Sequence, residues 1–135
     1  MNLELLKRKD RTVNPQNKWL KIVGIVLNVL IAAVMLLVGS VKAFGFAPQE
    51  MVDGMTGYGL ADYMVLIGVG EIVTALLLLI PWTSPLGTLA TSGFWGGVIC
   101  IHMSKGEPFL PACAFLAVTW LGSYLRGSVP LLWLK

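Results

Sequence analysis

Lys42, Glu71 and His102 are ionisable residues that lie within long apolar stretches of this 135-residue chain. Glu71 is near the middle of the apolar stretch 59–82, GLADYMVLIGVGEIVTALLLLIPW. If this stretch crosses a bilayer, at about 1.5 Å per residue the carboxyl group lies roughly 12–14 Å below the headgroups. An unpaired charge at that depth costs at least a few kcal/mol. Glu71 therefore needs a partner, for which Lys42 and His102 are the candidates.

A carboxyl, an ammonium and an imidazole group inside a membrane can bind the polar head of a ligand or exchange protons with it. For Glu71, a structural ion pair or a protonated, hydrogen-bonded carboxyl group is the competing interpretation. Lys42 can reach down to Glu71, or extend its stem to the headgroups as an interfacial anchor. His102 lies close to the surface, where a hydrogen-bonded interfacial histidine is the usual role. We expect these three residues to be the catalytic candidates.

The composition is that of an integral membrane protein. Hydrophobic residues make up 56% of the chain and charged residues 13%, and the mean hydropathy is +0.78. The formal charge of +3 comes mostly from residues 1–21, which indicates contact with lipid headgroups rather than with nucleic acid. The lipid bilayer is therefore an expected partner and a nucleic acid is not.

The hydropathy pattern predicts an all-α fold, a bundle of four transmembrane helices. A membrane domain of residues 19–135 follows a basic N-terminal arm, residues 1–18. A short interfacial helix is expected around Pro48 to Met55, in the polar connection between the first two spans. The tail after Arg126 either completes the last crossing or lies at the interface. The expected spans are about 19–44, 60–82, 85–103 and 109–125.

The distribution of basic residues predicts the orientation of the bundle. With four spans, eight Lys and Arg residues fall on the side of the N-terminal arm and two, Lys42 and Lys105, fall on the other. Because cytoplasmic loops carry the excess of basic residues, both termini are expected to be cytoplasmic. The expected location is the plasma membrane, crossed several times.

Helical spacing sorts the polar residues of the spans onto faces, which we expect to turn toward the bundle interior as one polar seam. In this seam Thr74 and Trp95 join Glu71 and His102 as expected ligand-binding residues. The faces are Asn28, Met35 and Lys42 in the first span, Met64, Gly68, Glu71, Thr74 and Leu78 in the second, and Thr88, Thr91, Trp95 and His102 in the third.

Small residues and cysteines give weaker indications. Two overlapping small-xxx-small pairs within residues 92–97, SGFWGG, predict that the third span packs closely on a neighbouring helix.

Cys100 and Cys113 flank the outer hairpin at similar depth, so a disulfide is geometrically conceivable. Two inert thiols are the favoured interpretation, because the chain has no C-x-x-C motif. No paired-histidine spacing and no Gly-rich phosphate loop occurs, so neither a metal nor a nucleotide is expected.

Three short motifs resemble the DoxX and DoxX-like membrane protein family. They are GSVKAFG at 39–45, Gly59-Leu60, and IGVGEI at 67–72 ahead of a leucine block. The resemblance covers roughly residues 19–126 and implies a four-helix membrane bundle. Some members of the family are subunits of a thiosulfate:quinone oxidoreductase or partners of redox enzymes. Carried over to this chain, the resemblance points to Lys42, Glu71 and His102.

On this basis the leading expectation is a quinone-binding or redox-associated membrane subunit, with a quinone as its cofactor. Glu71 would exchange the proton that accompanies quinone reduction. Lys42 would adjust the proton affinity of Glu71 by charge pairing. Any enzymatic role would be as a subunit of a quinone-linked oxidoreductase, with a redox-enzyme subunit or a second copy of the chain as its partner. Two alternatives stay open: a non-catalytic scaffold subunit of a membrane complex, and a binding protein or carrier for a small lipophilic molecule.

Overall fold

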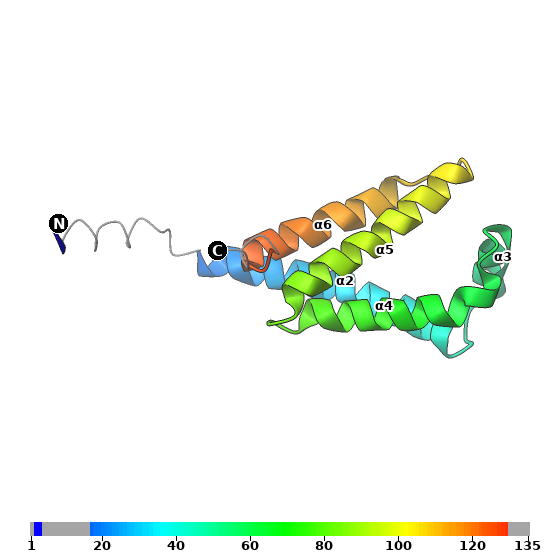
Figure 1. Cartoon of the computed structure of the whole chain (residues 1–135), viewed down its shortest axis with the longest axis horizontal. Helices are drawn as coiled ribbons and strands as arrows, with labels where there is room; N and C mark the ends of the chain where they lie inside the picture. The colour runs from blue at the N-terminus through cyan, green and yellow to red at the C-terminus, as the bar shows by residue number, and fades with distance from the viewer. Residues whose placement is uncertain (1, 4–16, 130–135) are drawn as a thin grey trace.

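The computed structural model describes residues 2–3 and 17–129, and Figure 1 shows that residues 17–129 fold into helices. Five α-helices and one short 3-10 helix, η1, lie in this part of the chain, which contains no strand. The predicted all-α fold is therefore confirmed. In chain order the elements are α2 (Lys18–Ala43), α3 (Gln49–Gly57), η1 (Ala61–Tyr63), α4 (Met64–Leu79), α5 (Ser84–Ser104) and α6 (Leu110–Arg126).

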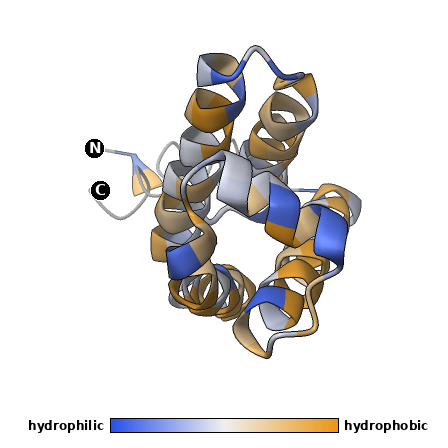
Figure 2. Ribbon diagram, turned by 90° about the vertical axis from the view of Figure 1, so that its right-hand side faces the viewer, coloured by the Kyte–Doolittle hydropathy of each residue, from blue (hydrophilic) through white to orange (hydrophobic). Residues whose placement is uncertain are grey.

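The four long helices pack side by side in a ring. α2 packs against α4 and α6, and α5 packs against the same two helices, so α2 and α5 are diagonally opposite. α4 and α5 join at a tight turn and diverge toward the other end of the molecule, where α3 lies (Figure 1). Figure 2 views the molecule from this α3 end, and α3 with its hydrophilic residues crosses in front of mostly hydrophobic helices. The short helix predicted around Pro48 to Met55 is therefore present as α3.

Three segments of the described chain are long and apolar enough to cross a membrane: Lys18–Ala43, Ala61–Leu79 and Ser84–Ser104. They match the first three expected spans to within a few residues. The fourth expected span, 109–125, is α6, whose 17 residues extend about 25 Å, somewhat less than the roughly 30 Å of a hydrocarbon core. Apart from residues 2–3 and 17–18, the expected basic arm lies outside the described residues, as do tail residues 130–135.

The helix ends follow from local chemistry. The Asn17 side chain caps α2 by accepting a hydrogen bond from the Trp19 backbone N–H at 3.2 Å. A proline lies in the first turn of both α5 and α6, where its missing N–H is not needed. α6 ends at Arg126, and the next residue, Gly127, caps it in the left-handed conformation that favours glycine, with a φ of +78°.

Glycines set three helix crossings, but not those predicted from the sequence. A Cβ on Gly68 of α4 would lie 2.6 Å from the Gly39 backbone oxygen of α2, and a Cβ on Gly24 of α2 would lie 2.6 Å from the Gly122 oxygen of α6. Gly87 of α5 packs equally closely on the Leu78 backbone of α4. Side chains at these positions would force the helix backbones apart.

The small residues of α5 do not make the predicted close contact. A Cβ on Gly93, Gly96 or Gly97 would meet no atom within 4 Å. The prediction of close packing there is wrong because a small-xxx-small pair permits close approach without determining whether a helix lies opposite.

The polar interior consists of two clusters rather than the single predicted seam. At the end opposite α3, Asn28 donates from Nδ2 to Ser123 Oγ at 3.2 Å, and Thr88 Oγ1 lies 2.7 Å from the same Ser123 oxygen. At the α3 end, Lys42 pairs with Glu71. The apolar core separates the two clusters, and its buried members are Ile31, Ala32, Met35, Ala75, Leu78, Trp95 and Ala112.

Arg126, the last residue of α6, caps α4. Its guanidinium donates from Nη1 to the Leu78 oxygen at 2.8 Å and from Nη2 to the Leu79 oxygen at 3.1 Å. Thr83 Oγ1 donates to the neighbouring Leu77 oxygen at 2.9 Å. These bonds satisfy carbonyl groups that the helix end leaves without an intrahelical partner.

Candidate functional site

Lys42 and Glu71 form an ion pair between α2 and α4. Lys42 Nζ donates to Glu71 Oε2 at 2.8 Å, and the side chains are 11% and 3% exposed. The crossing at Gly39 and Gly68 lies one turn away on both helices and brings their backbones close enough for this contact. Of the two partners considered from the sequence, Lys42 is therefore the one that pairs with Glu71, and it does not extend to the headgroups.

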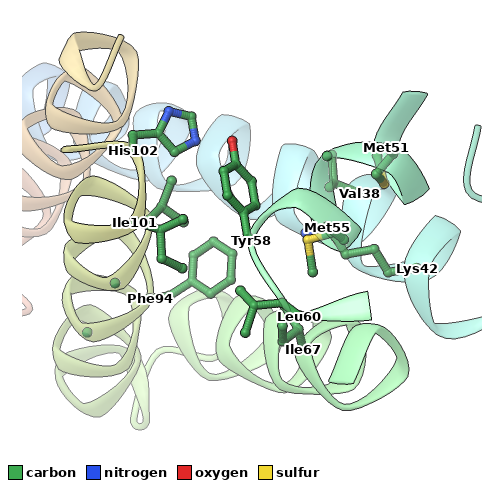
Figure 3. Close-up of a pocket in the computed structure, with 14 residues that line it drawn as sticks. Val38, Lys42, Met51, Met55, Tyr58, Leu60, Ile67, Phe94, Ile101 and His102 are labelled. Carbon is green, nitrogen blue, oxygen red and sulfur yellow. The ribbon is translucent and has the colours of Figure 1, made fainter. Parts of the chain in front are cut away.

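A pocket of about 560 Å³ lies between α4 and α5 at the α3 end of the bundle, with Lys42 on its wall (Figure 3). α2 forms its back, α5 one side, and the start of α4 with the preceding loop the other side, while α3 covers it. Most of its surface is apolar. Its lining residues are Val38, Lys42, Met51, Gly54, Met55, Tyr58, Leu60, Ile67, Gly93, Phe94, Gly97, Val98, Ile101 and His102.

Lys42 connects the buried carboxylate with the pocket. Its Nζ pairs with Glu71 on one side and lies 5.8 Å from the centroid of the Phe94 ring, which belongs to the pocket wall. At this distance the ammonium interacts favourably with the aromatic face. Because an ammonium has three donors and Glu71 accepts from one, Lys42 retains donors for another acceptor.

A hydrogen bond between Tyr58 and Glu107 closes the α3 end of the pocket. The Tyr58 hydroxyl, after α3, donates to Oε2 of Glu107 in the loop between α5 and α6. This hydrogen bond, together with burial and the charge of the carboxylate, raises the pKa of Tyr58 above 10.0. The bond therefore ties the two sides of the pocket together across 49 positions of the sequence.

His102 lines the pocket and is oriented by its own loop. Its Nδ1 lies 2.9 Å from the Pro108 carbonyl oxygen, and the same nitrogen is 4.0 Å from Glu107 Oε2. A carbonyl oxygen only accepts, so Nδ1 is the donor in this contact. In the neutral ring Nε2 is then an acceptor. The ring centroid is 5.9 Å from that of Tyr58.

The expected site residues are only partly brought together. Lys42 and His102 line the pocket, whereas Glu71 lies behind Lys42 and Thr74 is half-buried away from the lining. Trp95 is in the core, stacked on Phe115 with ring centroids 4.7 Å apart. Trp95 supports the pocket indirectly, because its ring also meets that of Phe94 edge-on at 5.2 Å.

The two cysteines are separate free thiols. Cys100 is exposed on α5 and Cys113 is half-buried on α6. The disulfide considered from the sequence is not formed, in agreement with the favoured interpretation.

Several residues that line the pocket were not predicted from the sequence, among them Tyr58, Met51, Met55 and Phe94. Their spacing carried a usable signal. Met51 and Met55 are four residues apart and so share a face of α3. On α5 the lining residues Phe94, Val98 and Ile101 follow helical spacing and form a face next to that of Trp95.

The pocket combines an apolar cavity with few polar groups. Lys42 supplies hydrogen-bond donors, His102 supplies an acceptor in its neutral form, and the Phe94 ring supplies a flat apolar surface. Because Glu71 neutralises Lys42, the pair does not favour an anionic ligand over a neutral one. The arrangement suits a flat, lipophilic molecule that carries oxygen atoms.

Comparison with known proteins assigns most of the chain to a family. The family model described as the DoxX-like family matches residues 26–122. The match contains α3, α4 and α5 completely and most of α2 and α6, including every residue that lines the pocket. No curated protein and no solved structure matches the chain.

Proposed function

This chain belongs to the DoxX-like family, and from that premise we propose that it is a redox-associated membrane subunit that binds a quinone in the pocket between α4 and α5. The single observation that carries the proposal is this apolar pocket of about 560 Å³ with the paired ammonium of Lys42 on its wall. Sites for small molecules are typically apolar cavities with a few placed polar groups. A bound quinone would supply two-electron, two-proton redox chemistry.

Each polar residue has a distinct role in this proposal. Lys42 donates a hydrogen bond to a ligand oxygen, and His102 Nε2 accepts one from a ligand hydroxyl group. Phe94 supports the flat ring of the ligand. Glu71 does not line the pocket, so it is a positioning residue that fixes the Lys42 ammonium. Electrons come from a partner redox enzyme, which makes this protein a subunit rather than a complete enzyme.

The proposal includes four crossings of the plasma membrane with both termini in the cytoplasm. α6 supplies the fourth crossing because it packs along both α2 and α5 and is apolar over most of its length. The excess of Lys and Arg that precedes the first span in the sequence favours this orientation. Labelling of single cysteines with a membrane-impermeant maleimide in whole cells tests it. Labelling at Lys105→Cys but not at Ser128→Cys supports the orientation, and the reverse pattern overturns it.

Thermal stability in detergent tests ligand binding, since a ligand that binds only the folded state raises the melting temperature. We expect ubiquinone or menaquinone analogues to stabilise the wild type. The double variant Lys42→Met, Glu71→Gln removes the ion pair without leaving one buried charge unpaired, and it should lose the ligand-induced shift. Lys105→Met is the matched control, because Lys105 is exposed and does not line the pocket.

The result separates the proposal from its competitors. A quinone shift that disappears in the double variant and persists in Lys105→Met supports quinone binding at this site. Stabilisation by redox-inactive lipophilic molecules in preference to quinones favours a binding protein or carrier. If neither the quinone analogues nor the redox-inactive lipophilic molecules stabilise the wild type, the proposal is contradicted and a scaffold subunit is favoured.

A further inference from the structure

The pocket is closed toward the α3 end of the bundle. α3 covers it with Met51, Gly54 and Met55, and the hydrogen bond between Tyr58 and Glu107 joins the α3 side to the loop after α5. Figure 3 shows Met51, Met55 and Tyr58 on this side of the pocket. α2 closes the back with Val38 and Lys42. A ligand that came from the aqueous side would have to displace α3 or break this hydrogen bond.

The pocket is open on the side between α4 and α5. Gly93 and Gly97 of α5 line the pocket and are exposed. A Cβ at either position would meet no atom within 4 Å, so neither a side chain nor a neighbouring helix covers this part of the wall. The cause is the divergence of α4 from α5, which begins at their close contact through Gly87.

The opening lies at the depth of the hydrocarbon core. Gly97 and Gly93 precede the end of α5 at Ser104 by seven and eleven residues, which places them about 10 and 16 Å below it. The polar lining residues Lys42 and His102 instead lie in the last turns of α2 and α5. The pocket is therefore polar near the interface and apolar where it opens into lipid.

We infer that the ligand is a two-part lipid, whose polar ring lies between Lys42, His102 and Phe94 and whose hydrocarbon chain passes Gly93 and Gly97 into the bilayer. This rests on the proposed function and adds the class of ligand and its route. The ligand enters sideways from the leaflet at the α3 end, and its chain remains in lipid while its ring is bound. Gly93 and Gly97 determine specificity because they leave the passage open.

Two probes with the same dimethoxy-methyl-benzoquinone ring, one without a tail and one with a decyl chain, test the inference by titration of tryptophan fluorescence in detergent. The wild type should bind the decyl compound roughly tenfold or more tightly than the tail-less ring. Gly97→Leu and, independently, Gly93→Leu fill the passage. Each should weaken binding of the decyl compound roughly tenfold more than it weakens binding of the tail-less ring.

Gly70→Leu is the matched control, because Gly70 is also exposed with no atom within 4 Å but does not line the pocket. It should bind both probes as the wild type does. Equal binding of both probes by the wild type, or an equal loss of both in Gly97→Leu and Gly93→Leu, overturns the inference and leaves quinone binding intact. Failure of the wild type to bind either probe rejects the proposed function itself, and the inference with it.

Discussion

Lys42 and Glu71 meet 2.8 Å apart at the crossing of α2 and α4, and both side chains are almost completely buried. The pair is 29 positions apart in the sequence and unites the first two long helices of the bundle. Its members differ in their surroundings, since Lys42 also faces the pocket and Glu71 does not.

Removal of one member of this pair should destabilise the protein far more than removal of both. Glu71→Gln or Lys42→Met alone leaves a buried partner without its counter-charge, and we expect a loss of about 3 kcal/mol. The double variant should lose about 1 kcal/mol or less relative to the wild type. The free energy of unfolding in mixed micelles of mild detergent and dodecyl sulfate measures the difference. Additive effects of the two single substitutions would show that the charges do not interact.

Gly68 and Gly70 should respond differently to the same substitution. A Cβ on Gly68 would meet the α2 backbone at 2.6 Å, so Gly68→Ala must move the two helices apart, at a cost of about 1–3 kcal/mol. Gly70 faces open space, so Gly70→Ala should change stability by no more than about 0.5 kcal/mol. The same unfolding measurement compares them. Equal costs would mean that the crossing at Gly39 and Gly68 is not a tight contact.

Arg126 should stabilise the bundle through α4. Arg126→Leu removes the donors to the Leu78 and Leu79 oxygens, and we expect a loss of about 1–3 kcal/mol. Arg126→Lys keeps the charge but loses the planar pair of donors, so it should fall between the wild type and Arg126→Leu. Lys105→Leu is the control for loss of an exposed charge. A stability for Arg126→Leu equal to that of this control would contradict the capping role.

The hydrogen bond of Tyr58 should make part of the stability depend on alkaline pH. The pKa of Tyr58 is raised in the folded protein, so the contribution is complete below pH 10.0 and is lost as the pH rises through the higher folded value. The melting temperature of the wild type should therefore fall toward that of Tyr58→Phe above pH 10. Melting curves of both proteins from neutral to alkaline pH provide the measurement. A constant difference between them across that range would argue against the hydrogen bond.

The sequence predicted the elements of the fold better than their contacts. Hydropathy is a local property of the sequence, so the helix bounds agree with the expected spans to within a few residues. The partner of Glu71 could be narrowed to Lys42 and His102, because lipid requires a counter-charge and the chain offers few. Spacing along α5 could not show that Trp95 faces the core while Phe94 faces the pocket, since that depends on how far α4 and α5 diverge.

The pocket itself depends on contacts between distant segments. Tyr58 and Glu107 meet only after α3, α4 and α5 are in place, and neither residue has a neighbour in the sequence that indicates the other. The small residues of α5 were correctly identified as a notable feature of the sequence. The sequence could not show whether they contact a helix or leave an opening.

The role of α6 has a consequence for the order of assembly in the cell. α6 is the last of these helices to leave the ribosome, yet it supplies Ser123 to Asn28 and Thr88, and Arg126 to the end of α4. Until it arrives, α2, α4 and α5 carry polar groups that lipid does not satisfy. A chain cut before residue 110 should therefore be recognised as incomplete and degraded, and biogenesis of this bundle is completed only by its final helix.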